Sequence, residues 1–182
     1  MRIYLVRHGQ TDWNLEKRMQ GREDVPLNAT GRAQAEKLRD KIRGLEFDVA
    51  YASPLKRAAE TAEIAVGDRY EIIYDERLVE RSFGEFEGKV CEIRAQPVEG
   101  IDIDDINLEE IPGKVETVKS IVARAEDFVN FLKQNHDPDA GILVVGHGAM
   151  SKAFDWVLSG CGKGDVFGSR RLENAEMWEY EI

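Results

Sequence analysis

The chain opens with an apolar run, Ile3-Tyr4-Leu5-Val6, that passes without a polar spacer into Arg7-His8-Gly9. A short apolar run bounded by a glycine is typical of a buried strand. In an open α/β sheet, ligands bind in the crevice beyond the carboxyl ends of the parallel strands. The pattern therefore predicts that Arg7 and His8 lie where a ligand would bind.

The same pattern returns late in the chain, where Ile142-Leu143-Val144-Val145 leads into Gly146-His147-Gly148. If the two runs form neighbouring parallel strands, His8 and His147 emerge side by side at one edge of the sheet. A single histidine after a strand is more often structural than catalytic. Two histidines in the same setting favour a shared site.

Strand-like and helix-like segments alternate between and after these two runs. Further strands are predicted at 47–52, 70–74 and 174–182, and helices from a cap at Asn28 or Thr30 to Gly44, from Pro54 to Gly67, from Val115 to Asn135 and from Ala149 to Leu158. Ser53 is predicted to be the N-cap of the helix that Pro54 begins. The last strand alternates apolar and acidic residues, as a half-exposed antiparallel strand near a sheet edge does. The order predicts an α/β fold with three layers, α/β/α, and a mostly parallel sheet with one antiparallel edge strand.

Two segments have little periodic pattern. Residues 15–27 are polar and are predicted to form a loop over the site. Residues 89–112 carry several acidic side chains and form a long connection, which in a compact domain is usually a lid or an insert. Part of 89–94 is predicted to be helical.

Size and charge limit the possible partners. A length of 182 residues suits one domain, and a net charge of -10 argues against a nucleic-acid partner, because binding to phosphate backbones depends on clustered Lys and Arg. A local cationic pocket for a small anion is compatible with an acidic exterior. The sequence leaves the oligomeric state open.

The two cysteines and the hydropathy predict a cytoplasmic protein. Cys91 and Cys161 have no metal-binding or redox spacing, which favours free thiols in a reducing compartment. Met1-Arg2 leads directly into the first predicted strand, so we expect no secretory leader. No apolar run approaches the length of a membrane span, and no membrane partner is expected.

The candidate catalytic groups are two imidazoles, two guanidiniums and one carboxylate. Arg57 lies in the first turn of a predicted helix, and Glu80 lies in a glycine-punctuated segment just after a predicted strand. Phosphoryl transfer needs cations for the equatorial oxygens, an in-line nucleophile and an acid for the leaving oxygen. A histidine nitrogen can be that nucleophile. A metal site is the weaker interpretation, since no metal-type His or Asp spacing accompanies the histidines and Arg7 would repel a cation. No Gly-x-Ser-x-Gly motif supports a serine triad.

In these residues and their order the chain resembles the histidine phosphatase superfamily, which includes cofactor-dependent phosphoglycerate mutase and fructose-2,6-bisphosphatase. Four motifs carry the resemblance, in the expected order and over most of the chain: Leu5-Val6-Arg7-His8-Gly9-Gln10-Thr11 with Asn14 and then Met19-Gln20-Gly21; Ser53-Pro54-Leu55 with Arg57-Ala58 and Thr61-Ala62; Leu78-Val79-Glu80 with Phe83-Gly84 and Glu87-Gly88; and Val144 through His147-Gly148.

The resemblance implies a phosphoglycerate mutase-like fold, a single domain over 1–182 and a role for each candidate. His8 would be the nucleophile that becomes phosphohistidine, and Glu80 would give a proton to the leaving oxygen. The phosphate pocket would consist of Arg7, Arg57 and His147, with Asn14, Gln20 and Gly21 also binding substrate. Members of the family need neither a metal nor an organic cofactor for hydrolysis.

The length of the 89–112 segment separates the possible activities. A mutase must keep water from the phosphohistidine, whereas a phosphatase must admit it, and a short lid favours the phosphatase. We therefore expect a metal-independent phosphatase acting on a small phosphorylated metabolite. The alternatives are a phosphoglycerate mutase-type isomerase, a protein phosphatase that admits a polypeptide, and an inactive phosphate-binding module.

Overall fold

A computed structural model describes residues 1–90, 100–160, 167–168 and 170–182. Its sheet is built from β1 (Arg2–Arg7), β2 (Val49–Ala52), β3 (Ile72–Tyr74), β4 (Gly141–Gly146) and β5 (Met177–Glu181). The strands lie in the order β3-β2-β4-β1-β5. All neighbouring pairs are parallel except β1 and β5, which are antiparallel. The predicted sheet, with one antiparallel strand at its edge, is confirmed.

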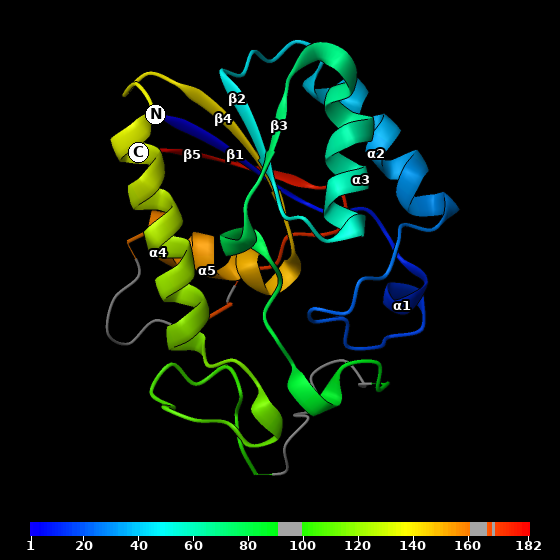
Figure 1. The fold of residues 1–182 in the computed structure, drawn as a ribbon, viewed down its shortest axis with the longest axis vertical. Coiled ribbons are helices and arrows are strands. Elements are labelled where there is room, and N and C mark those ends of the chain that lie inside the picture. Colours follow the sequence, from blue (N-terminus) through cyan, green and yellow to red (C-terminus); the bar gives the residue numbers. More distant parts are fainter. Residues whose placement is uncertain (91–99, 161–166, 169) are drawn as a thin grey trace.

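Helices cover both faces of this sheet (Figure 1). They are α1 (Asp12–Leu15), α2 (Ala29–Ile42), α3 (Lys56–Val66), α4 (Val118–Asn135) and α5 (Gly148–Leu158), with short 3-10 turns η1 (Gly67–Arg69), η2 (Glu76–Leu78), η3 (Gly84–Phe86) and η4 (Pro112–Lys114). The helices α2 and α3 lie on one face, and α4 and α5 lie on the other. In the described part of the chain, no helix combines the length and apolarity needed to cross a bilayer.

Side-chain alternation along β1 explains the three layers. Ile3 and Leu5 are buried against α4 and α5, whereas Tyr4 and Val6 are buried against α2 and α3. A strand that is buried on both faces reads as a continuous apolar run, because successive side chains point to opposite faces. The central position of β1 and β4 in the sheet follows from these runs.

Several helix boundaries differ from the prediction. Ser53 is not the N-cap of α3: its N–H still donates to Val145 O at 3.0 Å, so residue 53 continues the extended ladder. Leu55 is also extended, and α3 begins only at Lys56. The helix α4 begins at Val118 rather than at Val115, because the Thr117 side chain accepts from Ser120 N and caps it. Of the two predicted caps of α2, Asn28 or Thr30, the structure has Asn28, whose side chain accepts from Gly31 N.

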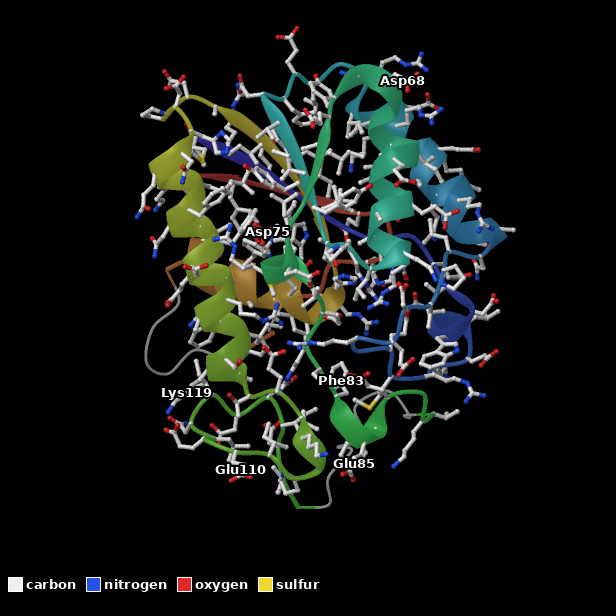
Figure 2. All side chains as sticks on the ribbon, viewed as in Figure 1. Asp68, Asp75, Phe83, Glu85, Glu110 and Lys119 are labelled. Carbon is white, nitrogen blue, oxygen red and sulfur yellow. The ribbon has the colours of Figure 1, made fainter. Side chains whose placement is uncertain are left out.

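Residues 100–112 of the predicted insert form a small apolar cluster with the segments on either side of the insert. Ile103 and Ile111 are buried together with Val115, and Phe83 packs against them. Phe83 and Glu110 both lie at the end of the molecule that is drawn below the sheet in Figure 2. Of the stretch 89–94, where a helix was predicted, only Lys89 and Val90 are described. Val90 forms an antiparallel bridge with Arg18, and the rest lies outside the described residues.

Arg81 fixes this insert to the segment that carries Glu80. Its buried guanidinium donates to Glu116 O at 2.7 Å and Ile103 O at 2.6 Å, and it forms an ion pair with Asp104 at 2.7 Å. A buried arginine with these partners holds the two segments together. The insert therefore packs directly beside the chain neighbours of Glu80.

Candidate active site

The two histidines meet at the carboxyl ends of β1 and β4. These strands are parallel neighbours, with Arg7 paired to Gly146, and His8 N donates to Gly146 O at 3.0 Å. The ring centroids of His8 and His147 are 5.2 Å apart. Both side chains are buried, with exposed fractions of 2% and 0%. The structure thus brings together the two residues that the repeated strand pattern placed at one edge.

One ring nitrogen of His8 contacts a backbone carbonyl, and the other is free to react. Its Nδ1 lies 2.7 Å from Gly9 O, and a carbonyl can only accept, so Nδ1 carries the proton. Nε2 makes no hydrogen bond with the described residues and keeps its lone pair. Burial and the nearby Arg57 and Arg7 guanidiniums lower the pKa of His8 well below its usual range. The ring is therefore neutral and nucleophilic at Nε2.

The Gly9 backbone that holds His8 is itself fixed by close contact with α2. A Cβ placed on Gly9 would lie 2.5 Å from Gly31 O, a distance that no side chain can occupy. Gly9 N donates to Thr61 Oγ1 at 3.0 Å, which ties the same loop to α3. These two contacts position the carbonyl that selects the His8 tautomer.

The two arginines are buried and only partly paired. Arg7 donates from Nη1 to Leu172 O at 2.9 Å. Arg57 donates from Nη1 to Glu23 O and from Nη2 to Gly21 O, both at 2.7 Å. In both residues Nε is buried and has no partner among the described residues. Burial lowers the pKa of Arg57 to about 10, so it is still a cation at neutral pH.

His147 adds a third buried nitrogen without a hydrogen-bond partner among the described residues. It is the N-cap residue of α5, and its Nε2 lies 2.8 Å from Ser53 Oγ. Its Nδ1 is buried without a partner among the described residues. Burial and the Arg57 guanidinium lower the pKa of His147, so the ring is neutral. Buried polar atoms without partners are costly, and an oxyanion with several acceptor oxygens would satisfy the donors among these three nitrogens.

Glu80 lies at the N-terminus of α5, beside the cations. Its Oε1 accepts from the backbone N–H groups of Arg81 at 2.9 Å and of Ala149 and Met150 at 3.1 Å. A Cβ placed on Gly148 would lie 3.4 Å from Arg7 Nε and 3.7 Å from Glu80 Oε2. The carboxylate and the Arg7 guanidinium therefore border the same first turn of α5. A helix N-terminus also favours a bound anion.

The remaining predicted substrate-binding residues lie around these groups. Asn14 Oδ1 accepts from Thr11 N at 3.1 Å and closes the capping box of α1, while its Nδ2 makes no hydrogen bond with the described residues. Gln20 is buried, and its Oε1 has no partner in the described part of the chain. Gly21, at φ 51°, contributes the carbonyl that orients Arg57.

Several supporting residues were not predicted as part of the site. They are Ser53, which contacts the His147 ring, Thr61, which holds Gly9, and Asn174, whose Nδ2 donates to His8 O at 2.9 Å. Ser53 and Thr61 do lie inside the motif around Arg57, where hydroxyl side chains four residues before and four residues after a candidate cation could have signalled a role. No pattern in the sequence marks Asn174.

Within the described ranges, no three His, Cys, Asp or Glu side chains gather in a way that could hold a metal ion. The site consists of a neutral histidine, two buried guanidiniums, a second imidazole and a carboxylate. This is the equipment of an α/β enzyme that acts on a phosphoryl group.

Comparison with known proteins agrees with that class. The family model described as "Histidine phosphatase superfamily (branch 1)" matches residues 3–182, and the chain belongs to this superfamily. The predicted enzyme class, a phosphoric monoester hydrolase, agrees with it.

Two curated relatives and one solved structure illustrate the range of similar proteins. "Uncharacterized phosphatase PhoE" of Bacillus subtilis is 35% identical over 177 residues, covering 95% of this chain and 84% of the relative. "Phosphoglycerate mutase-like protein 4" of Arabidopsis thaliana is 32% identical over 158 residues, covering 83% of this chain and 68% of the relative. A mycobacterial glucosyl-3-phosphoglycerate phosphatase, solved in complex with VO3, has a TM-score of 0.84 at 27% identity and covers 98% of this chain and 91% of its own.

Proposed function

We propose that the chain is a phosphatase that hydrolyses a phosphomonoester of a small metabolite through a phosphohistidine on His8. One observation carries the proposal: the free Nε2 of a neutral, buried histidine lies among unpartnered nitrogens of Arg7, Arg57 and His147. An anion held by those nitrogens would present its phosphorus to a nucleophile that needs no deprotonation.

In the first step the lone pair of His8 Nε2 forms a bond to phosphorus, and the bond between phosphorus and the leaving oxygen breaks. The protonated carboxyl of Glu80 gives its proton to that oxygen, and the alcohol departs. In the second step a water oxygen attacks the phosphohistidine while Glu80 takes a proton from the water. The bond between Nε2 and phosphorus breaks, so inorganic phosphate, neutral His8 and protonated Glu80 result. Arg7 and Arg57 hold the equatorial oxygens throughout.

Ion pairs next to the site favour a substrate without a second anionic group. The cations that follow or precede site residues in the chain are already paired: Arg22 with Glu116, Lys56 with Asp24, and Arg81 with Asp104. A phosphoglycerate carries a carboxylate beside its phosphate and would have to compete with Glu116, Asp24 and Asp104 for these cations, so the mutase is the second candidate.

Phosphate release in the presence of a chelator tests this function. The panel contains phosphoglycerates, sugar mono- and bisphosphates, nucleotides, an aryl phosphate and a phosphopeptide. We expect metal-independent release, fastest from monophosphates with an uncharged remainder. Release from the phosphopeptide alone would replace the metabolite by a protein substrate. Absence of release, together with interconversion of phosphoglycerates after priming with a bisphosphate, would instead establish the mutase. The predicted cytoplasmic location stays a prediction.

The low pKa of His8 predicts how the site responds to acid. A histidine titrates near pH 6.5 when it is unperturbed, and a lowered pKa keeps the ring neutral as the pH falls through that value. In an NMR titration of imidazole-labelled protein, the His8 resonances are expected to show no midpoint as the pH falls from neutral through about 6.5. The measurement avoids the substrate's own phosphate ionisation near pH 6. A His8 midpoint close to 6.5 would contradict the buried, cation-flanked setting.

A further inference from the structure

Ser53 and His147 lie at the carboxyl ends of neighbouring parallel strands. Ser53 directly follows β2, and His147 directly follows β4. The Ser53 hydroxyl oxygen is 2.8 Å from His147 Nε2, and both residues have an exposed fraction of 0%. The contact is therefore a hydrogen bond sealed from solvent, on the side of the ring away from the unpartnered Nδ1.

The direction of this hydrogen bond follows from the other partners of the hydroxyl. Ser53 Oγ already accepts from Leu55 N at 3.3 Å, so one lone pair is in use. The hydroxyl has a single proton to donate, and His147 Nε2 is its one acceptor among the described residues. If Nε2 carried the imidazole proton instead, the buried Ser53 proton would have no acceptor. The arrangement that satisfies both groups has Oγ–H donating to Nε2.

We propose that Ser53 is a positioning residue that holds neutral His147 as the tautomer protonated at Nδ1. This inference rests on the proposed function, because it assigns the use of that proton: Nδ1–H donates to a phosphoryl oxygen of the substrate. With the opposite tautomer, an Nδ1 lone pair would face the phosphoryl oxygens and repel them. The low pKa of His147 is consistent with this role, since the ring stays neutral and one nitrogen must lack a proton.

The position of the bond suits this task. The N–H of Ser53 donates to Val145 O, so the residue is fixed to β4 two positions before His147. The Leu55 N–H donates to the Ser53 hydroxyl oxygen and occupies one of its lone pairs, so the hydroxyl proton is left to point toward the His147 ring. A serine at this point can thus set the imidazole tautomer without touching the substrate.

The chain offers a matched control. Ser151 is also fully buried and also bonds His147, but its hydroxyl donates to the backbone carbonyl at 2.6 Å instead of to the ring. Ser151→Ala removes a buried hydroxyl that contacts His147, but it leaves the hydrogen bonds of the His147 ring nitrogens unchanged. Ser53→Thr keeps a hydroxyl donor at the position under test.

The experiment is 15N NMR of protein with labelled imidazoles, without ligand and then with orthovanadate. The chain has 3 histidines, so assignment needs few variants. In the wild type and in Ser151→Ala we expect His147 protonated at Nδ1. In Ser53→Ala we expect the Nε2–H form to appear and vanadate to bind about tenfold more weakly, the size of one hydrogen bond to a charged group. Ser53→Thr is expected to restore both values.

Two results would overturn the assignment: His147 protonated at Nε2 in the wild type, or an unchanged tautomer in folded Ser53→Ala. The tautomer is read in the ligand-free protein and does not depend on turnover. A chain that releases no phosphate but shows the expected tautomers would refute the proposed function and keep the Ser53 assignment.

Discussion

Replacing His8 with alanine is expected to reduce phosphate release by roughly 10⁴-fold or more, as the loss of a covalent nucleophile does in other enzymes. Alanine removes Nε2, the nitrogen that would attack phosphorus, while Arg7 and Arg57 still bind the anion. The fold should persist, since within the described part of the chain the His8 side chain bonds only the next residue's carbonyl. The measurements are kcat on the best monophosphate and acid-labile phosphate bound to protein after quenching, which we expect only in the wild type.

The third histidine provides the control for this experiment. His136 follows α4, and its Nε2 lies 2.9 Å from the Tyr51 hydroxyl. It borders a cavity together with Asp48 and Ala140, which precede β2 and β4 and so lie at the opposite end of the sheet from the site. His136→Ala should keep turnover. Full activity of a folded His8→Ala protein, with labelled phosphate still bound, would assign the covalent step to another residue.

The sheet and the meeting of the two histidines are predictable from the sequence, because each depends on a local pattern. An apolar run without polar breaks, as in 142–145, must be buried on both faces, and a central parallel strand is the usual place for it. Two such runs that end in His-Gly then meet at the carboxyl edge. The boundary of α3 is not predictable in this way. Ser53-Pro54 is a typical sequence for the start of a helix. However, the hydrogen bond from Ser53 N to Val145 O in β4 extends the strand by one residue.

The supporting contacts of the site are harder to predict, since they join residues that are distant in sequence. Arg57 is oriented by carbonyl groups of Gly21 and Glu23, which lie in a loop with no periodic pattern. Arg81 directly follows Glu80 and, from the sequence, could equally be a cation that binds the substrate. In the structure it forms an ion pair with Asp104 of the insert instead. Every residue has a backbone carbonyl, so the sequence does not show which carbonyls will orient an arginine. An ion pair with the insert depends on how the insert packs. Only the folded chain decides between a guanidinium that binds substrate and one that binds its own chain.

Changing Glu80 to glutamine is expected to slow hydrolysis to an extent that depends on the leaving group. An amide cannot give a proton to the departing oxygen, so alkyl phosphates should react about 10²- to 10⁴-fold more slowly. An aryl phosphate, whose leaving oxygen needs no proton, should lose much less. Glutamine keeps a side-chain oxygen that can accept from Ala149 N and Met150 N, so the start of α5 should remain intact. The measurement is kcat/KM across a series of phosphomonoesters of graded leaving-group acidity, because kcat/KM reports phosphoryl transfer to His8 and not the later hydrolysis of the phosphohistidine.

The dependence on the leaving group separates proton donation from a structural effect. Glu87→Gln is the matched control, because Glu87 lies in the same segment and its Oε1 accepts from Phe83 N at 2.8 Å and Arg22 N at 3.2 Å. Its loss should disturb the loop and slow all substrates by a similar factor. In Glu80→Gln the slope of log kcat/KM against leaving-group acidity should become steeper than in the wild type. If Glu80→Gln instead lowers kcat/KM equally across the series, the carboxyl acts by holding the first turn of α5, and the proton for the leaving oxygen must come from water.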